Sequence, residues 1–173
     1  WIGEAEAKAG LPVGGLPVLC SLETARGVWN ALEIAQADPR VLMIGFGGVD
    51  FARDIGIDTA SDGQATLYAR SRLVLAARVA GIRPPVESVY AHLQDEAGLE
   101  ASTRQAKALG YFGRAAIHPR QLECINRVFT PTPEEVGRAR EIVSVAASAE
   151  ARGSGAVQLP DGTFIDAPVV QRA

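Results

Sequence analysis

The sequence has little lysine: only Lys8 and Lys107 of its 17 basic residues are lysines, and the others are arginines. Both lysines lie in segments with helical patterning and not at the ends of predicted strands. A lysine that forms a Schiff base with a carbonyl substrate is one route to breaking a carbon–carbon bond. This chain offers no obvious lysine for that role, so imine chemistry is disfavoured.

The sequence also has few cysteines, no long apolar run and little net charge. Cys20 and Cys124 are far apart and lack metal-ligand spacing, which indicates two reduced core thiols rather than a disulfide. No apolar run approaches the roughly 20 residues of a membrane-spanning helix, and no signal peptide is visible. The net charge of −3 argues against nucleic-acid or membrane-surface binding. We therefore expect a cytoplasmic protein with neither a nucleic acid nor a membrane as its partner.

Four continuous apolar runs are present, and a segment with helical spacing follows each of them. Such strands, joined by helices, are typical of a parallel sheet covered on both faces, which predicts an α/β fold. Four units of about 40 residues correspond to half of a (β/α)8 TIM barrel, which typically needs about 250 residues. We predict that residues 1–130 form this half barrel. The expected strands are 15–23, 41–47, 85–93 and 113–119, and the expected helices are 24–37, 64–80, 96–110 and 121–128.

Residues 131–173 lie beyond the repeating pattern and are expected to form a C-terminal helix and a lid extension. Thr132, Pro133 and Glu135 have the spacing of a capping box, which predicts a helix start. This helix is expected to end near Ala151, where the sequence Gly-Ser-Gly follows at 153–155. Two short β-like segments then flank a Pro-Asp-Gly turn at 160–162. The extension is a candidate lid or subunit contact.

Two acidic residues follow the first two predicted strands: Glu23 and Asp50. In parallel α/β folds the functional site lies outside the carboxyl ends of the strands. Two carboxylates there would repel each other in a dry site, and a divalent cation such as Mg²⁺ removes that conflict. The alternative is that each acid caps the helix after it, because a helix N-terminus favours negative charge.

Other polar residues near the strand ends have simpler interpretations. Asp95 precedes a helix and is expected to be its N-cap, and His118 is expected to make a structural hydrogen bond. Arg70 and Arg72 lie on one predicted helix, where they are expected to be solvated or to form interhelical contacts.

The sequence Gly-Phe-Gly-Gly-Val-Asp at 45–50 is not a dinucleotide-binding motif, because it lacks the third glycine and the following acidic residue of that motif. We expect Gly47, Gly48 and Val49 to be substrate-binding instead, with backbone N–H groups that approach a carboxylate beside the metal.

Several segments together resemble the HpcH/HpaI aldolase/citrate lyase family, in particular its citrate lyase β-subunit-like branch. They include "LETARGVWNALEIAQADPRV", "IGFGGVDFARDIG", "ALGYFGRAAIHPRQLECIN" and "FTPTPEEVGRAREIV". The resemblance implies a (β/α)8 barrel with a C-terminal extension, commonly assembled as a homotrimer or a dimer of trimers. It also implies cleavage or formation of carbon–carbon bonds in acyl-CoA thioesters such as citryl-, malyl- and citramalyl-CoA.

The resemblance assigns roles to three residues of this chain. It implies that Glu23 and Asp50 bind Mg²⁺ at barrel strands five and six. It implies that Asp166, in "FIDAP", is catalytic and reaches the site from the lid of a neighbouring subunit. The family's strands one to four have no counterpart here, and neither has their substrate-binding arginine. We therefore expect this chain to show strands five to eight of a longer polypeptide.

The expected activity is that of a Mg²⁺-dependent lyase, which converts a hydroxyacyl-CoA thioester into a 2-keto acid and acetyl-CoA. One alternative is a truncated assembly subunit without activity. Another is a Mg²⁺-dependent class II aldolase that acts on free 2-keto acids. The "IHPRQ" and "FIDAP" segments argue against that aldolase, because they resemble the branch that uses CoA thioesters.

Overall fold

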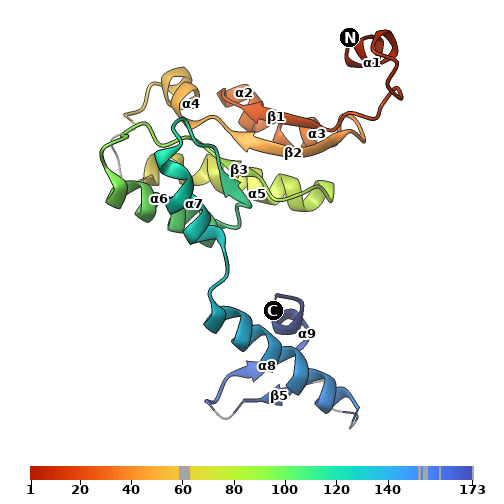
Figure 1. The fold of residues 1–173 in the computed structure, drawn as a ribbon, viewed down its shortest axis with the longest axis vertical. Coiled ribbons are helices and arrows are strands. Elements are labelled where there is room, and N and C mark those ends of the chain that lie inside the picture. Colours follow the sequence, from red (N-terminus) through yellow and green to blue (C-terminus); the bar gives the residue numbers. More distant parts are fainter. Residues whose placement is uncertain (59–62, 152, 154–155, 160, 173) are drawn as a thin grey trace. The chain divides into compact units, whose positions relative to one another are not determined.

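The computed structural model describes residues 1–58, 63–151, 153, 156–159 and 161–172. The chain divides into two compact units, which we call the N-terminal unit (Trp1–Phe129) and the C-terminal unit (Thr130–Ala173) (Figure 1). Part of the expected Gly-Ser-Gly break at 153–155 and Pro160 of the expected turn lie outside the described residues.

The N-terminal unit contains a four-stranded parallel sheet with its strands in chain order, which confirms the predicted α/β class. In the described residues the sheet is open, with the first and last strands at its edges, and no closed barrel is formed. The last two strands are shorter than predicted, because the chain leaves the sheet after two residues and the next residues form loops. The strands are β1 (Val18–Leu22), β2 (Val41–Phe46), β3 (Val86–Glu87) and β4 (Gly113–Arg114).

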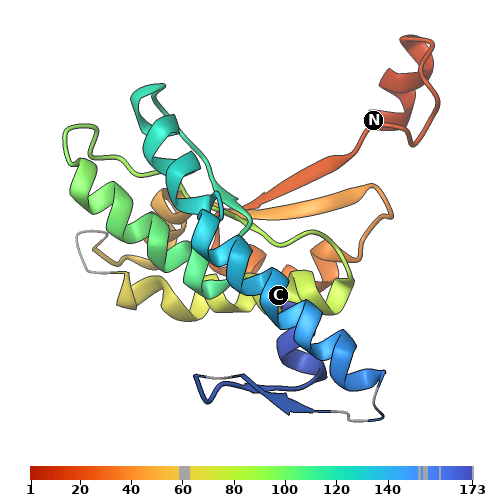
Figure 2. The ribbon, with the colours of Figure 1, turned by 60° about the horizontal axis from the view of Figure 1, so that its bottom comes forward.

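Helices follow every strand of this sheet, and the two long helices of the unit lie together on one side of the strands (Figure 2). Small side chains that are fully or almost fully buried, such as Ala31, Ala77 and Ala106, let these helices pack closely around Ile44 and Leu73. The helices are α2 (Ala25–Trp29), α3 (Ala31–Ala35), α4 (Gly48–Ile55), α5 (Leu67–Ala80), α6 (Glu96–Leu109) and α7 (Arg120–Phe129), with a 3₁₀ turn η1 (Gln64–Thr66).

The opposite face of the sheet is less covered than the sequence predicts. Cys20 and Leu22 of β1 point into the core, whereas Leu19, which precedes Cys20, is 55% exposed. Leu42 at the start of β2 is also exposed. Two-sided coverage, expected from the continuous apolar strands, is therefore not found at these positions.

The predicted helix 24–37 is interrupted at Asn30, which separates α2 from α3. Arg72 of α5 explains the interruption. Its Nε donates to the carbonyl oxygen of Val28 at 2.8 Å and to that of Trp29 at 3.1 Å. Its guanidinium also lies over the Trp29 ring, 5.3 Å from the centroid. Carbonyl groups that accept hydrogen bonds from a side chain tilt away from the helix axis and weaken the helical hydrogen bonds, so one helix ends and the next begins at Asn30. Arg72 thus makes the interhelical contact that was one of its two expected roles.

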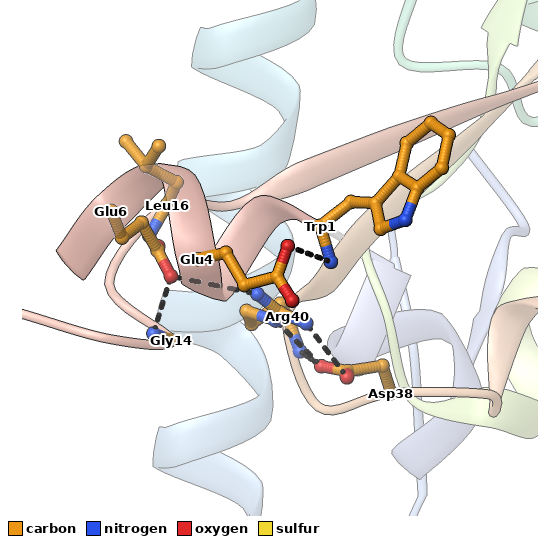
Figure 3. A network of polar contacts seen from close by, with 7 residues as sticks. All are labelled: Trp1, Glu4, Glu6, Gly14, Leu16, Asp38 and Arg40. Carbon is orange, nitrogen blue, oxygen red and sulfur yellow. Dashed lines mark hydrogen bonds and ion pairs between the residues drawn. The ribbon is translucent and has the colours of Figure 1, made fainter. Parts of the chain in front are cut away.

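A buried carboxylate of the first helix, α1 (Ile2–Lys8), binds the segment that follows the helix (Figure 3). Glu6 is 1% exposed and accepts hydrogen bonds from the amides of Gly14 and Leu16, at 2.7 and 2.8 Å. Arg40 lies 3.7 Å away and also pairs with Asp38. The two amides and the guanidinium favour the charged form and lower the pKa of Glu6.

The C-terminal unit is built on α8 (Pro133–Glu150), whose start is the predicted capping box between Thr132 and Glu135. The strands β5 (Val157–Gln158) and β6 (Phe164–Ile165) pair antiparallel, and α9 (Ala167–Arg172) follows. Arg138 joins the helix to the hairpin through Asp161 and Thr163. Within the part of the chain that the structure describes, no helix has the length and apolar character needed to cross a membrane.

Candidate metal and substrate site

The carboxyl ends of β1 and β2 bring two acidic residues to the same edge of the sheet. The strands pair in parallel, with Leu22 opposite Phe46, so both chains leave the sheet at one level. Glu23 is the first residue after β1. Asp50 is the third residue of α4, which begins two residues after β2. Glu23 and Asp50 therefore both lie exposed at the carboxyl ends of two neighbouring strands.

The side chain of Glu23 lies directly against Gly47. A Cβ atom built on Gly47 would be 2.4 Å from Cγ and 2.8 Å from Oε1 of Glu23, which is closer than real Cβ atoms come. Ser21 donates a hydrogen bond to Oε1 of the same carboxylate at 2.8 Å. The absent side chain at Gly47 thus makes the space in which the Glu23 carboxylate is held.

Neither acid is the N-cap residue of the helix after it, so the capping interpretation is wrong for Glu23 and holds for Asp50 only through the helix dipole. The N-cap of α2 is Thr24, whose Oγ1 accepts from the amide of Gly27 at 3.0 Å. The N-cap position of α4 is Gly47, and Asp50 lies inside the first turn of that helix. Asp50 still benefits from the helix dipole there. The helix dipole therefore favours an acid at position 50, whereas no helix cap accounts for the acid at position 23.

The two carboxylates have the chemistry that a magnesium ion requires. Both residues are exposed, and the Asp50 side chain is 53% accessible, with Arg53 at 3.8 Å as an exposed ion-pair partner. No cluster of three or more histidine, cysteine, aspartate or glutamate residues that could hold a metal occurs among the described residues. Two hard carboxylate ligands, with water and substrate oxygens in the other positions, suit Mg²⁺ better than Zn²⁺.

The three residues expected to bind substrate through their amides differ in how those amides are used. The Gly47 amide donates to the carbonyl of Leu22 at 3.0 Å, and the Gly48 amide donates to Oγ of Ser88 at 2.8 Å. Val49 is the second residue of α4, so its N–H has no acceptor inside the helix. Of the three amides, that of Val49 is the one best placed to receive a ligand oxygen.

A cavity of about 1000 Å³ lies beyond the carboxyl ends of β2, β3 and β4. Gly48 and Val49 line one part of it, and Ser88, Tyr90 and Arg114 line another. This volume is at the upper end of the range for ligand pockets, about 300–1,000 Å³. The cavity therefore connects the predicted glycine segment with the loop that follows β3.

A buried polar cluster, formed by Arg70, Glu87, Tyr111 and Arg114, supports the wall of this cavity. Nε of Arg70 donates to Oε2 of Glu87 at 2.6 Å, and the two side chains are 7% and 3% exposed. The Tyr111 hydroxyl donates to the carbonyl of Arg70 at 3.1 Å, and burial raises the pKa of Tyr111. Burial also lowers the pKa of Arg114, whose Nε has no hydrogen-bond partner among the described residues.

No sequence pattern indicates a role for Glu87, Tyr111 or Arg114. The expectation that Arg70 is solvated or contacts another helix is wrong, because Arg70 is buried and pairs with Glu87 of β3. One signal of this pair was available: Glu87 is a single carboxylate inside an apolar run, where an uncompensated charge would be costly. The partner could not be identified, because many arginines of the chain lie on predicted helices.

Two further expectations near the strand ends are confirmed. Asp95 is the N-cap of α6, and its Oδ1 accepts from the Gly98 amide at 2.9 Å. The Tyr90 hydroxyl donates to the other carboxylate oxygen at 2.5 Å, and both bonds lower the pKa of Asp95. His118 makes a structural bond, in which its Nδ1 accepts from the amide of Arg120 at 3.1 Å.

Asp166, the expected catalytic residue, lies in the C-terminal unit between β6 and α9. It is half-buried, and its Oδ1 accepts from the Val169 amide at 3.3 Å. Its backbone carbonyl accepts from the amide of Val170. Asp166 therefore caps α9, which restricts the orientations of its carboxylate.

Comparison with known proteins supports the resemblance seen in the sequence. The HpcH/HpaI aldolase/citrate lyase family matches residues 2–119. The citrate lyase subunit beta of Leuconostoc mesenteroides subsp. cremoris is 38% identical over 172 residues, which are 99% of this chain and 56% of that protein. The mitochondrial citramalyl-CoA lyase of Rattus norvegicus is 34% identical over 160 residues, which are 88% of this chain and 47% of that protein.

A solved structure extends the comparison to three dimensions. It is the crystal structure of protein CitE from Mycobacterium tuberculosis in complex with magnesium, acetoacetate and coenzyme A. The two are 26% identical with a TM-score of 0.77, over 97% of this chain and 68% of that chain. The present chain spans about half the length of the curated relatives it matches. It belongs to the HpcH/HpaI aldolase/citrate lyase family.

Proposed function

We propose that the protein is a Mg²⁺-dependent lyase that cleaves a carbon–carbon bond in a hydroxyacyl-CoA thioester and gives a 2-keto acid and acetyl-CoA. The observation that carries the proposal is the placement of Glu23 and Asp50 beyond paired strands, where neither residue caps a helix. Relatives named citrate lyase subunit beta and citramalyl-CoA lyase, and a CitE structure that contains magnesium and coenzyme A, support it.

In this proposal Glu23 and Asp50 hold the ion, which supplies Lewis acidity to the substrate's hydroxyl and carboxylate oxygens when bound. Gly47 leaves the space that Glu23 occupies. The Val49 amide donates to the substrate carboxylate and fixes its orientation, while Gly48 contributes to the wall of the cavity that would hold the substrate.

Asp166 is proposed to move the proton that the reaction requires. Cleavage passes the hydroxyl proton to water and breaks the carbon–carbon bond, whose electron pair stays with the acetyl-CoA fragment, so the hydroxyl-bearing fragment becomes a 2-keto acid and the other fragment leaves as the enolate of acetyl-CoA. Asp166 of a neighbouring copy then donates a proton to the enolate carbon, or removes it in the condensing direction. Its bond to the Val169 amide would hold the carboxylate in a defined orientation for this transfer. A homotrimer or a dimer of trimers would supply the neighbouring copy.

We also propose that residues 1–130 are strands five to eight of a (β/α)8 barrel and that residues 131–173 are its C-terminal helix and lid. Three features support this proposal. The sheet has open edges at β1 and β4, an apolar residue of β1 is exposed on the face without helices, and relatives are about twice as long. Unpaired edges and exposed apolar faces are normally covered in a folded protein.

The test compares the complete protein with its Glu23→Gln and Asp50→Asn variants, using malyl-, citramalyl- and citryl-CoA as substrates. Loss of a metal ligand removes several kcal/mol of transition-state stabilisation, so we expect turnover to fall at least about 100-fold in each variant. Glu33→Gln, which changes an exposed carboxylate of α3, should leave turnover unchanged. Turnover that survives both substitutions and EDTA treatment would overturn the proposal.

A further inference from the structure

Ser88 uses three polar groups to join distant parts of the N-terminal unit. Its amide donates to Oε1 of Glu87 at 2.8 Å, and its carbonyl accepts from Nη1 of Arg114 at 3.1 Å. Its Oγ accepts from the amide of Gly48 at 2.8 Å, across 40 positions in the sequence. With its amide, carbonyl and hydroxyl all engaged, Ser88 has little freedom to change its orientation.

Ser88 is bonded to two residues of the buried polar cluster, Glu87 and Arg114. Oε1 of Glu87 binds the Ser88 amide, while Oε2 is held by Nε of Arg70 at 2.6 Å. Because the Arg70 and Glu87 side chains are almost fully buried, breaking their bond would be costly. Ser88 is therefore bonded to a buried ion pair, directly after β3.

The hydroxyl of Ser88 satisfies a backbone group that α4 leaves unpaired. The first N–H groups of a helix have no acceptor inside it, and a side chain at the N-cap position usually supplies one. Gly47 occupies that position in α4 and has no side chain to offer. Ser88 supplies the acceptor from a neighbouring strand, and it does so at Gly48, two residues before Asp50.

The contact between Ser88 and α4 is also tight. A Cβ atom on Gly48 would lie 3.1 Å from Oγ of Ser88 and 3.0 Å from Cε1 of Phe46. The first turn of α4 thus packs so closely against Ser88 that a side chain at position 48 would require Phe46 or Ser88 to shift by a few tenths of an ångström. Asp50 lies in the same turn, two residues after Gly48.

We propose that Ser88 is a positioning residue of the metal site: it caps α4 from the end of β3 and so holds Asp50 where its carboxylate can share an ion with Glu23. This inference rests on the proposed function. It adds a link from the buried Arg70–Glu87 pair to the geometry of the metal ligands.

The test measures Mn²⁺ affinity, by electron paramagnetic resonance of the free ion, in the complete protein without substrate. Replacing residues that orient metal ligands typically weakens binding about 10- to 100-fold, and we expect Ser88→Ala to weaken Mn²⁺ binding about 10-fold. Ser88→Thr keeps the hydroxyl and should restore most of the affinity. Ser148→Ala, which removes a hydroxyl bonded to a backbone carbonyl in α8, should bind as the wild type does.

The Asp50→Asn variant separates the two proposals. If Asp50→Asn binds Mn²⁺ as tightly as the wild type, the metal site itself is wrong. If that variant loses binding while Ser88→Ala keeps it, the role of Ser88 alone is overturned. Should Ser88→Ala fail to fold, Ser88→Cys takes its place, because a thiol is a weaker acceptor of similar size. Weaker binding in the cysteine variant would then support the proposal, and unchanged binding would overturn it.

Discussion

Polar side chains at the carboxyl ends of β1 and β2 (the first part) are exposed, whereas those near the carboxyl ends of β3 and β4 (the second part) are mostly buried. Beyond β1 and β2, Glu23 and Asp50 are exposed, and the closest cation to Asp50 is a solvated Arg53 at 3.8 Å. At the end of β3, Glu87 is buried and bonded at 2.6 Å to Arg70 of α5. The carboxylates of the first part make only exposed contacts, with Ser21 and Arg53, whereas the carboxylate of Glu87 is used in buried bonds.

This difference indicates that the exposed carboxylates are suited to ligand binding and that the buried pair stabilises the structure around them. A ligand can compete for exposed carboxylates at small cost, because little internal bonding is lost. It cannot compete for Glu87, because breaking a buried ion pair would leave a charge without a partner. Function is therefore expected to depend on the first part, and stability on the second.

The largest effect is expected from breaking the buried pair. Arg70→Met removes one partner and leaves the Glu87 charge buried, which typically costs about 3–5 kcal/mol of unfolding free energy. Urea denaturation measures this change. The double variant Arg70→Met/Glu87→Leu should recover part of the loss, since it removes both charges. Arg104→Met breaks an exposed pair on α6 and serves as the control. A loss no larger than that of the control would contradict the supporting role.

A smaller and more specific effect is expected at the exposed part. Gly47→Ala would place a Cβ atom 2.4 Å from Cγ of Glu23, so the carboxylate must move. We expect Mg²⁺ affinity to fall by at least about 10-fold, as for other changes that disturb ligand orientation. Isothermal titration calorimetry measures this affinity. Gly113→Ala is the matched control, because nothing lies within 4 Å of a Cβ atom at that glycine of β4. Equal affinities in the two variants would show that Glu23 does not hold the ion.

The alternation of the four parallel strands with their long helices was predictable, because these elements carry their own local signals, whereas α4 and α9 were not predicted. Continuous apolar runs identified β1 and β2, and the caps at Asp95 and Thr132 were visible within four residues of sequence. Thr24 carries the same kind of signal as the cap of α2, but Glu23 beside it is equally compatible with a helix start, so the cap could not be assigned from the sequence. Local patterns were therefore sufficient for most of the elements whose structure is decided by local bonds.

The remaining features depend on contacts between residues that are distant in the sequence. The pairing of Arg70 with Glu87 joins a helix to a strand, and the break at Asn30 is caused by Arg72, which lies 42 positions later. The bond between Ser88 and Gly48 spans 40 positions. No spacing rule relates such residues, so the support of the site could not be predicted although its two candidate ligands could.

Asp95, the N-cap of α6, is expected to make the free energy of unfolding depend on pH. It lies in the segment that follows β3. Bonds from the Tyr90 hydroxyl and the Gly98 amide lower the pKa of Asp95 below its ordinary value of 3.8. A lowered folded-state pKa stabilises the protein above the ordinary value, and this stabilisation is lost as pH falls through the lowered pKa. Unfolding free energies measured between pH 2.5 and 6 should therefore decline less steeply in Asp95→Asn than in the wild type.

The control for this pH series is Glu123→Gln, which removes an exposed carboxylate from the first turn of α7. It should follow the wild-type curve more closely than Asp95→Asn does. If Asp95→Asn and the wild type decline in parallel, the hydrogen bonds to Asp95 do not favour its charged form in solution.

The smallest effect is expected from Arg53→Ala, and it distinguishes two reasons for an acid at position 50. If Asp50 served mainly as the ion-pair partner of Arg53, loss of the arginine would remove its purpose and destabilise α4. Exposed pairs of this kind contribute little, so we expect the unfolding free energy to change by less than about 0.5 kcal/mol. Removing a nearby positive charge should leave Mg²⁺ affinity unchanged or slightly higher, whereas Asp50→Asn should abolish it. A clear loss of affinity in Arg53→Ala would mean that the pair, and not the free carboxylate, organises this part of the edge.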